Sequence, residues 1–569
     1  MRVLNALYDS KTKSQIAYKI QVGNSERIIG TERARYLLLC GIEIEGLKLS
    51  VDNKEIEICN NINIIGFKVY MDCLDENQIY SENRTDISNK ELILEVCNRT
   101  IIRDIQTDLD NWYSRYGRTN VIKIEGPKQV GKTTEAIKFA LKHYKNIVYI
   151  DADDTKHIGL MENLDVFNSG LTFKKYCEDI EENFTDDKNT VVIFDNTQKN
   201  YRLYNILNKL QSTLRCDIIA VYGLAAKVRN PVYNVQLGLE TFRMRTLSFE
   251  EFCRARGCDE YLYTLSAINN KNMLAHRKMV EEYRVYTQIG GYPAVVDRFL
   301  KSEDTLDLFD CNEILGKLLE DINEDCEAYI DYNNFEELHT EIAYSIVCRK
   351  IGRDEIGTDV LSRCIGLFSM TDEDKLKDAL IWLINCGIIE GCDCYIDKVE
   401  NICRRQMKLY YMDCGLARYI YDLAGIPVEE KKNFIDRCFI FNELSRRYSN
   451  FSTKGIRGYA PTFMILNDTE IDFVIEDFEN NVYGVQVRDK DSNEVRQILD
   501  IEDTKHKYFA IIASERPGNV WGCGVSNKIT VEVPIYLLGR GLLDIIETVK
   551  DVNKQEESTK EQLIDVGIA

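Results

Sequence analysis

The sequence predicts an α/β protein with a parallel-sheet core, a mostly helical middle region and a second α/β domain towards the C-terminus. Between residues 118 and 250, β-type runs alternate with helical stretches, which is the pattern of βαβ units and a parallel sheet. From about 251 to 425 the pattern is mostly helical, and from about 426 to 545 strands and helices mix again. The four strands expected in the first sheet cover residues 121–124, 147–150, 190–194 and 217–222.

Length and composition indicate several closely packed globular domains. A chain of 569 residues is too long for one hydrophobic core, and roughly 100 to 200 residues per domain suggests about three to five domains. The 44% hydrophobic and 29% charged residues are ordinary for a globular protein, with only 7 prolines and no Gly/Ser-rich tract. We therefore expect no long flexible linker between the domains.

Neither a membrane span nor a disulfide framework is expected. The N-terminus, MRVLNALYDSKTKSQ, lacks an apolar signal core, and the apolar stretch at 379–389 is far shorter than the ~20 residues that a membrane helix needs. The 19 cysteines are scattered without a CxxC pair, and only 5 histidines accompany them. We expect reduced cysteines in a cytoplasmic protein, with no membrane partner and no zinc at Cys392 and Cys394.

The charge balance argues against a general nucleic-acid-binding protein. A net charge of −21 repels phosphate backbones at long range. One basic stretch, from Arg404 to Arg457, holds eleven Lys/Arg against six Asp/Glu, a net of +5. We favour a solvated surface that balances acidic neighbours over a nucleic-acid contact.

The N-terminal part reads as a small α/β module with an interaction or structural role. Its expected strands lie at 16–22, 42–50 and 64–71, around a helix near 32–40. Apolar residues at intervals of three to five between 90 and 116 predict a helix leading into the next domain.

The segment GPKQVGKTT carries the strongest chemical signal. It has the GxxxxGK[ST] pattern of a phosphate-binding loop, follows the strand-like VIKI and precedes the helix-like TEAIKFALKHY. Backbone N–H groups of such a loop face phosphate oxygens, the lysine reaches the β and γ phosphates, and the first threonine binds Mg²⁺. The predicted nucleotide-binding residues are Gly126, Lys128, Gly131, Lys132, Thr133 and Thr134.

A second segment, NTVVIFDNTQ, completes the predicted magnesium site. It is an apolar strand that ends in Asp195, some seventy residues after the phosphate-loop strand. A carboxylate there can organise Mg²⁺ through its waters, together with Thr133. The alternative is an ordinary buried strand that ends in a turn.

The helical middle contains a segment, 358–396, that reads as helix, turn, helix and short strands, as in a winged helix. The second of these helices, 374–385, opens near the acidic sequence TDEDKLKD. Four acids against two lysines are unsuited to a DNA major groove, so we expect this region to pack against protein.

Taken together, these segments resemble bacterial AAA+-type ATPases whose C-terminal half carries a winged helix and a restriction-endonuclease-like, PD-(D/E)XK-type domain. The resemblance covers about 100–490 and rests on the order of six segments: GPKQVGKTT, IFDNTQ, LSFEEF, GGYPAVV, KLYYMDCGL and EIDFVI. It implies the following domains: a small α/β module at 1–90, an AAA+-type ATP-binding domain at 91–300, a helical and winged-helix region at 301–425, a nuclease-like domain at 426–545 and a polar tail at 546–569.

The ATP-binding part departs from the family pattern at positions that the resemblance assigns to catalysis. The family usually has a glutamate after the strand-ending aspartate, where this chain has Asn196, which orients water but accepts no proton. Gln198 is retained. The family's Thr-Gly-Ser is replaced by Tyr222-Gly223-Leu224, and a usual Gly-Arg by Gly238-Leu239. Asn196 and Gln198 are therefore the candidate catalytic positions of a slow or inactive ATPase.

Further residues are weaker candidates for the same reaction. If Asn196 is not at the catalytic position, Asp151 or Asp153 after the second strand must act instead. Arg229 and Arg243 are candidates for an arginine supplied to a neighbouring subunit.

The nuclease-like part departs in the same way. Such nucleases hold metal with an Asp and a Glu from adjacent strands and use a nearby Lys. Here Asp472 is present, but Gln486 and Arg488 stand in place of the Glu and Lys, so we expect an inactive site. Glu443 is another carboxylate in this region, for which we expect an exposed surface position.

Three functions remain open. The first is an ATP- and Mg²⁺-binding protein whose nucleotide state changes the packing of the other domains, with an unidentified protein partner. The second is an interaction scaffold with a structural nucleotide. The third, a nucleic-acid-processing enzyme, rests on fold analogy and the local basic stretch and is not favoured.

Overall fold

The computed structural model describes the following residues, and every structural statement below refers to them: 2–8, 15–22, 25–30, 49–51, 54–56, 101–152, 173–174, 177, 184–199, 207, 209–224, 239–259, 272–302, 308–330, 338–339, 379–380, 382–395, 407–447, 460–466, 469–477, 480–487, 494–501, 505–517, 519–523 and 528–539. The chain forms two compact units, Met1–Arg245 and Thr246–Ala569.

The N-terminal strands form two small antiparallel assemblies. Strands β1 (Arg2–Tyr8), β2 (Gln15–Val22) and β3 (Ser25–Gly30) pair in sequence order, and β4 (Leu49–Val51) pairs with β5 (Lys54–Ile56). Strand β2 lies where a strand was expected at 16–22. The helix expected near 32–40 and the strand expected at 64–71 lie outside the described residues.

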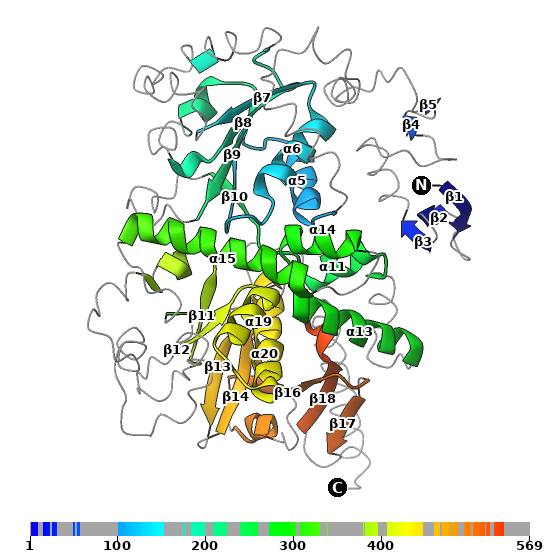
Figure 1. The fold of residues 1–569 in the computed structure, drawn as a ribbon, viewed down its shortest axis with the longest axis vertical. Coiled ribbons are helices and arrows are strands. Elements are labelled where there is room, and N and C mark those ends of the chain that lie inside the picture. The colour runs from blue at the N-terminus through cyan, green and yellow to red at the C-terminus, as the bar shows by residue number, and fades with distance from the viewer. Residues whose placement is uncertain are drawn as a thin grey trace, which may run out of the picture. The chain divides into compact units, whose positions relative to one another are not determined.

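The first unit contains the predicted parallel sheet. Its strands are β6 (Val121–Gly126), β7 (Asn146–Asp151), β8 (Thr190–Asp195), β9 (Asp217–Gly223) and β10 (Glu240–Arg243). All are parallel, in the order β10-β6-β9-β8-β7 (Figure 1). The strands expected at 121–124, 147–150, 190–194 and 217–222 are therefore confirmed, and the order places β9 between β6 and β8.

Two helices accompany this sheet. Helix α6 (Lys132–His143) packs on β6, β8 and β9, and α5 (Ile105–Ser114) packs on α6 (Figure 1). A 3₁₀ turn, η3 (Thr197–Lys199), follows β8. The helix expected at 90–116 begins only at Ile105, because the residues before it are not helical where they are described and Arg103 bonds to two carbonyl groups of the domain instead.

Strands β7, β8 and β9 carry apolar runs that are buried, whereas β10 is partly exposed. Continuous hydrophobic runs are the pattern of parallel strands that are covered on both faces. Strand β8 is buried along its whole length. One side of the sheet contributes to a core that includes Val148, Val192, Phe194, Ile218 and Tyr222.

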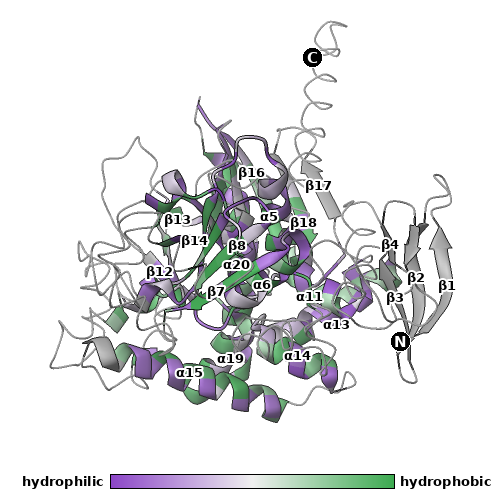
Figure 2. Ribbon diagram, turned by 90° about the horizontal axis from the view of Figure 1, so that it is seen from above, coloured by the Kyte–Doolittle hydropathy of each residue, from purple (hydrophilic) through white to green (hydrophobic). Residues whose placement is uncertain are grey.

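The described part of the second unit contains several helices. These are α11 (Phe249–Arg256), α13 (Met273–Ile289), α14 (Pro293–Lys301), α15 (Leu308–Ile330), α19 (Cys414–Leu423) and α20 (Val428–Arg447). Helix α15 alternates hydrophobic and hydrophilic residues along its length (Figure 2), and Leu315, Leu318 and Ile322 of its apolar side are buried whereas Phe309 is exposed. This is the amphipathic pattern of a helix with one face on the core.

The second unit also contains a six-stranded mixed sheet. Its strands are β13 (Thr462–Leu466), β14 (Thr469–Glu476), β15 (Asn481–Val487), β16 (Lys507–Ser514), β17 (Asn519–Cys523) and β18 (Lys528–Pro534), in the order β13-β14-β15-β16-β18-β17. Short 3₁₀ helices follow β15 and β18, namely η5 (Glu494–Asp500) and η6 (Ile535–Leu537). The pairing is parallel between β15, β16 and β18 and antiparallel elsewhere. The expectation of a second α/β region is confirmed.

The division between the units falls inside the range 91–300 expected for the ATP-binding domain. Residues after Arg245 bond within the second unit instead. The Thr246 hydroxyl donates to the Met412 carbonyl at 3.3 Å, and the Tyr283 hydroxyl donates to Asp436 at 2.7 Å. From Thr246 on, the chain is thus bonded to other residues of the second unit, whereas Met244 still bonds to Glu125 of β6.

The expected winged helix is only partly described. Strands β11 (Ile389–Asp393) and β12 (Met407–Tyr411) form an antiparallel pair, but residues 358–378 lie outside the described residues. Among the described helices, none has the length and hydrophobicity of a membrane-spanning segment.

Candidate nucleotide-binding site

The phosphate-loop residues lie between β6 and α6, as the sequence predicts. Gly131 has φ 92°, a left-handed conformation that glycine adopts without strain, and it turns the chain into α6. The loop thereby opens directly on the N-terminus of α6, where unpaired backbone N–H groups favour an anion. Lys128 is exposed in the loop, Thr134 lies in the first helical turn, and Gly126 ends β6.

Lys132 is positioned inside this loop. Its ammonium group donates to the Pro127 carbonyl at 2.5 Å. Burial lowers the pKa of Lys132 to about 8, against the attraction of the Asp195 carboxylate. An ammonium group with such a pKa gains from an added negative charge, which a phosphate supplies.

Thr133 and Asp195 meet at the expected magnesium site. The Thr133 hydroxyl donates to Asp195 Oδ2 at 2.7 Å, and the Tyr149 hydroxyl donates to the same oxygen at 2.7 Å. Asp195 is only 4% exposed. Burial raises the pKa of its carboxyl group above the ordinary value, with the nearby Asp151 adding to the rise, although these hydrogen bonds oppose it.

This arrangement fits a bound Mg²⁺. A hydroxyl and a buried carboxylate in contact are hard oxygen ligands, which Mg²⁺ prefers. Burial is the main cause of the raised pKa of Asp195, and a bound metal ion would oppose that rise.

Asn196 is held in one orientation by its neighbours. Its φ of 50° is left-handed, which Asn tolerates better than most residues. Its side-chain amide donates to Asp151 Oδ1 at 2.9 Å, and its side-chain oxygen accepts from Gln198 Nε2 at 3.1 Å. The structure thus brings together Asn196 and Gln198, the catalytic candidates of the sequence analysis, and Asp151, which that analysis named as an alternative acid.

Gln198 links the ends of two strands. Its side-chain oxygen accepts from the Gly223 backbone N–H at 2.8 Å, and the adjacent Thr197 hydroxyl donates to the Val221 carbonyl at 2.8 Å. Gly223 ends β9, the strand between the phosphate loop and Asp195. The Tyr222 side chain is fully buried in the apolar core of the sheet.

Sequence reasoning missed Arg103, whose side chain hydrogen-bonds to the backbone of the phosphate loop. Its guanidinium donates to the Val130 carbonyl at 2.8 Å and to the Arg245 carbonyl at 2.6 Å. Nearby, Gln106 and Lys138 bond to the buried Glu135 of α6. A cation inside the apolar sequence IIRDI was the signal that could have indicated this buried position.

The arginine candidates remain predictions. Arg243 donates to Glu125 at 2.7 Å within its own domain, while three quarters of its side chain stays exposed. Arg229 and Asp153 lie outside the described residues.

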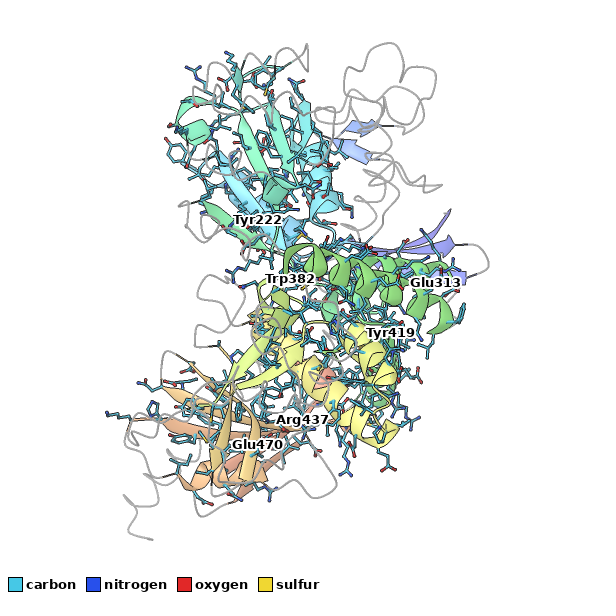
Figure 3. The ribbon with its side chains drawn as sticks, turned by 60° about the vertical axis from the view of Figure 1, so that its left-hand side comes forward. Tyr222, Glu313, Trp382, Tyr419, Arg437 and Glu470 are labelled. Carbon is cyan, nitrogen blue, oxygen red and sulfur yellow. The ribbon has the colours of Figure 1, made fainter. Side chains whose placement is uncertain are left out.

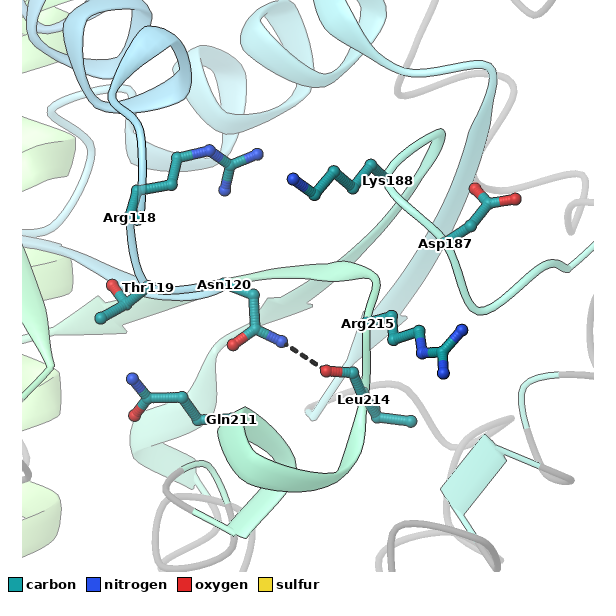
Figure 4. Close-up of a pocket in the computed structure, with 9 residues that line it drawn as sticks. Arg118, Thr119, Asn120, Asp187, Lys188, Gln211, Leu214 and Arg215 are labelled. Carbon is teal, nitrogen blue, oxygen red and sulfur yellow. Dashed lines mark hydrogen bonds between the residues drawn. The ribbon is translucent and has the colours of Figure 1, made fainter.

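A cavity of about 550 Å³ lies at the N-terminal ends of the strands of this sheet, at the end opposite to the phosphate loop (Figure 4). It is lined by residues that precede β6, β8 and β9, among them Arg118, Lys188 and Arg215. The Asn120 side chain donates to the Leu214 carbonyl at 2.8 Å there. The phosphate loop follows β6 and Asp195 ends β8, so this cavity is separate from the candidate nucleotide site.

Two of the residues that the family resemblance assigned to a degenerate nuclease site, Asp472 and Gln486, lie in a buried polar cluster. Asp472 on β14 is fully buried and accepts from Arg437 of α20 at 2.7 Å and from the Val487 backbone N–H at 2.9 Å. Gln486 on β15 accepts from the Asp472 backbone N–H at 3.4 Å. Figure 3 labels Arg437, which lies on α20, and Glu470, which lies on β14. Arg488 lies outside the described residues.

The expectation of an exposed Glu443 is wrong. This residue is 2% exposed, and its carboxylate accepts from the Phe249 backbone N–H at 3.2 Å. Helical periodicity did not show that this face of α20 packs on α11.

Two of the segments that carried the family resemblance meet at the centre of the second unit. Gly290 and Gly291 of GGYPAVV lie against Asp413 of KLYYMDCGL, which accepts from the Gly291 backbone N–H at 2.7 Å. Gly290 has φ 76°, and a Cβ atom there would lie 2.1 Å from the Asp413 carboxylate. These segments therefore form a packing junction.

Most described cations of the basic stretch have carboxylate partners. The pairs are Lys408–Glu470, Arg418–Asp422, Lys431–Asp422, Lys432–Asp436 and Arg437–Asp472. Cations neutralised in this way are less available to a phosphate backbone.

A family model identifies the domain that carries the site. Residues 118–253 match the family model of an AAA domain, and residues 280–427 match a domain of unknown function (DUF8612). Among curated proteins, none matches this chain. The first unit's sheet and phosphate loop thus belong to an AAA-type P-loop domain, which is consistent with ATP binding.

Solved structures show only distant likeness. A Walker-type ATPase of Pyrococcus abyssi, PABY2304, is 11% identical, with 56% of this chain and 95% of that chain covered and a TM-score of 0.33. A RuvB variant of Thermotoga maritima is 13% identical, with 51% and 90% covered and a TM-score of 0.24. The RuvB Holliday junction branch migration motor of the same organism is 13% identical, with 51% and 89% covered and a TM-score of 0.23.

Proposed function

We propose that this protein binds ATP with Mg²⁺ as a nucleotide-dependent switch that hydrolyses ATP slowly. The contact between Thr133 and Asp195 carries the proposal, because it joins the phosphate loop to the metal-organising carboxylate. Around it, the α6 N-terminus and Lys132 supply positive potential for the phosphates. Slow turnover follows from Asn196, a neutral amide beside Asp195.

Each residue would have a separate task. The loop N–H groups and Lys132 would bind and orient the β and γ phosphates, and Thr133 and Asp195 would hold Mg²⁺ directly or through water. Bound Mg²⁺ would neutralise charge on the phosphate oxygens. Asn196 would orient a water molecule, while its bond to Gln198 connects that position to Gly223 at the end of β9.

The experiment is a comparison of ATP and ADP on the purified full-length protein, with and without Mg²⁺. A switch requires that ATP and ADP have different consequences, since a ligand with equal affinity for two states shifts neither. We expect Mg²⁺-dependent ATP binding, turnover well below ~1 s⁻¹, and different proteolysis patterns of the second unit with the two nucleotides. Identical patterns with both would favour a scaffold with a structural nucleotide.

For the second unit we propose an inactive nuclease-like domain that serves protein packing. Its support is the buried Arg437–Asp472 ion pair, in which the guanidinium of Arg437 binds the carboxylate that a metal ion would need. Gln486 offers one neutral amide in place of a second acid. We expect no cleavage of DNA or RNA with Mg²⁺ or Mn²⁺, and cleavage by wild type that disappears in Asp472→Ala would show that the site is active.

A further inference from the structure

We infer that the carboxylate that accepts the proton during ATP hydrolysis is Asp151, one strand away from the position where the sequence pattern expects an acid. This inference rests on the proposed ATP-binding function and identifies a catalytic residue for it. Its basis is the contact between Asn196 Nδ2 and Asp151 Oδ1 at 2.9 Å.

The sheet brings the two residues together. Strands β7 and β8 are parallel neighbours, and Asp151 and Asp195, their last residues, are partners in register. The Ala152 backbone N–H donates to the Asp195 carbonyl at 3.1 Å, which fixes the chain after β7 at this edge. Asp151 is therefore held beside Asp195 and Asn196 by backbone bonds.

Asn196 points towards Asp151 for a conformational reason. The left-handed φ of 50° turns Asn196 out of the strand direction, and its own backbone N–H donates to Asp195 Oδ1 at 2.8 Å. Gln198 then holds the amide oxygen, which leaves the amide nitrogen facing Asp151. Two bonds thus orient the side chain and a third fixes the backbone, as expected of a group that must position a reactant.

Asn196 and Asp151 together perform the two tasks of the glutamate that the family has after the strand-ending aspartate, namely orienting the water and accepting its proton. A carboxylate has about four acceptor sites and an amide has two N–H groups, so the bond between Asp151 and Asn196 uses only part of the hydrogen-bonding capacity of either group. Asn196 holds this water and Asp151 accepts its proton. Asp151 is only partly buried, so water reaches it.

In the reaction, the water oxygen forms a bond to the γ-phosphorus while the bond between that phosphorus and the bridging oxygen of ADP breaks. One water proton moves to the Asp151 carboxylate and later to solvent. The products are ADP and inorganic phosphate. Asp195 is less suited to the proton transfer, because Thr133, Tyr149 and the Asn196 backbone already donate to its two oxygens.

The test measures ATP affinity and turnover separately on the full-length protein. Asp151→Asn keeps the size of the side chain, removes its charge and basicity, and replaces one acceptor oxygen by an NH₂ group. We expect ATP affinity within about threefold of wild type and turnover reduced by about 100-fold or more, the usual range for loss of a general base. The matched control is Asp187→Asn, at the opposite edge of the sheet.

The exchange variant Asp151→Asn/Asn196→Asp distinguishes catalysis from structure. It keeps one amide and one carboxylate in contact but reverses them, so we expect it to recover at least about tenfold of the lost turnover. A second readout is the ADP fraction in a stoichiometric ATP complex after storage, which should stay low in Asp151→Asn alone.

Several results would contradict these expectations. Turnover by Asp151→Asn at the wild-type rate, or an exchange variant as slow as the single variant, would overturn this inference while leaving ATP binding intact. Wild type that binds ATP but never converts it to ADP would also overturn it. Failure of wild type to bind ATP at all would instead reject the proposed function, and this inference with it.

Discussion

The guanidinium of Arg103 donates a hydrogen bond to the backbone carbonyl of Val130, the residue before Gly131 in the phosphate loop. The same guanidinium binds the Arg245 carbonyl, at the last residue of the first unit. One buried side chain therefore joins the loop that faces phosphate to the segment after which the second unit begins in sequence. A change in loop conformation on nucleotide binding would have to move or break one of these two bonds.

Arg103→Ala should weaken ATP binding by about tenfold and lower stability by about 1 to 3 kcal/mol, because a buried carbonyl loses its donor. Calorimetric titration with ATP and urea unfolding measure the two effects. The matched control is Arg115→Ala, whose partner Glu240 lies in an exposed ion pair, for which we expect a change below about 1 kcal/mol. Equal effects of both variants would mean that Arg103 has no special relation to the loop.

Lys132→Ala should abolish nucleotide binding and leave the fold intact, since Lys132 supplies charge to the phosphates and its loss removes little packing. Binding of a fluorescent ATP analogue and far-ultraviolet circular dichroism measure these outcomes. Lys145→Ala changes an exposed lysine of the same domain and should bind as wild type does. Undiminished binding by Lys132→Ala would refute the site assignment.

ATP binding should take up a proton above pH 8. The pKa of Lys132 is lowered to about 8 without ligand, so the ammonium form is complete below that pH and is lost as pH rises through it. Phosphate binds the charged form and raises this pKa again, so affinity should fall by up to tenfold per pH unit above about 8. Titration in buffers of different ionisation enthalpy should show nearly one proton taken up at about pH 9 and almost none at about pH 7. The absence of uptake at the higher pH would mean that Lys132 is neutral in the complex.

The loop, its strand and Asp195 could be predicted from the sequence because each depends on a short segment. A glycine-rich pattern between an apolar strand and a helix specifies its own local structure, and β8 is an uninterrupted apolar run that ends in a single acid. Such information lies within about ten residues and needs no tertiary partner.

The contacts that decide the chemistry could not be predicted, because they join distant segments. Arg103 and Val130 are 27 residues apart, and Asn196 and Asp151 are 45 apart. The second contact depends on β7 lying beside β8, which the strand order specifies and a hydrophobic pattern does not. Glu443 was misjudged for the same reason, since the packing partner of its helix is not encoded in its periodicity.

Asp472→Asn should destabilise the second unit by about 3 to 5 kcal/mol, because Arg437 would remain buried without its counter-charge. The double variant Arg437→Met/Asp472→Leu should lose less, because it removes both charges together. Urea unfolding followed by circular dichroism measures both. A single variant as stable as wild type would mean that the pair is solvated in solution and that Asp472 is accessible to a metal.

Asn196→Glu should raise ATP turnover, because it places a carboxylate directly after Asp195, where related nucleotidases activate water. The gain should be limited by Asp151, whose carboxylate is bonded to the Asn196 amide: two carboxylates in contact share a proton, and the pKa of one rises. Asn196→Glu/Asp151→Asn restores one acid and one amide, so its turnover should exceed that of the single variant by about tenfold or more.

Glutamate at a left-handed φ should also cost about 1 to 2 kcal/mol of stability. Lys132→Ala should erase every gain, since it removes nucleotide binding. Phosphate release at one fixed, high ATP concentration measures the turnover of wild type and of each variant. If wild type already hydrolyses ATP at ~1 s⁻¹ or more and neither Asn196 variant changes that rate, then Asn196 does not face the attacking water, and Asp151 must act without it.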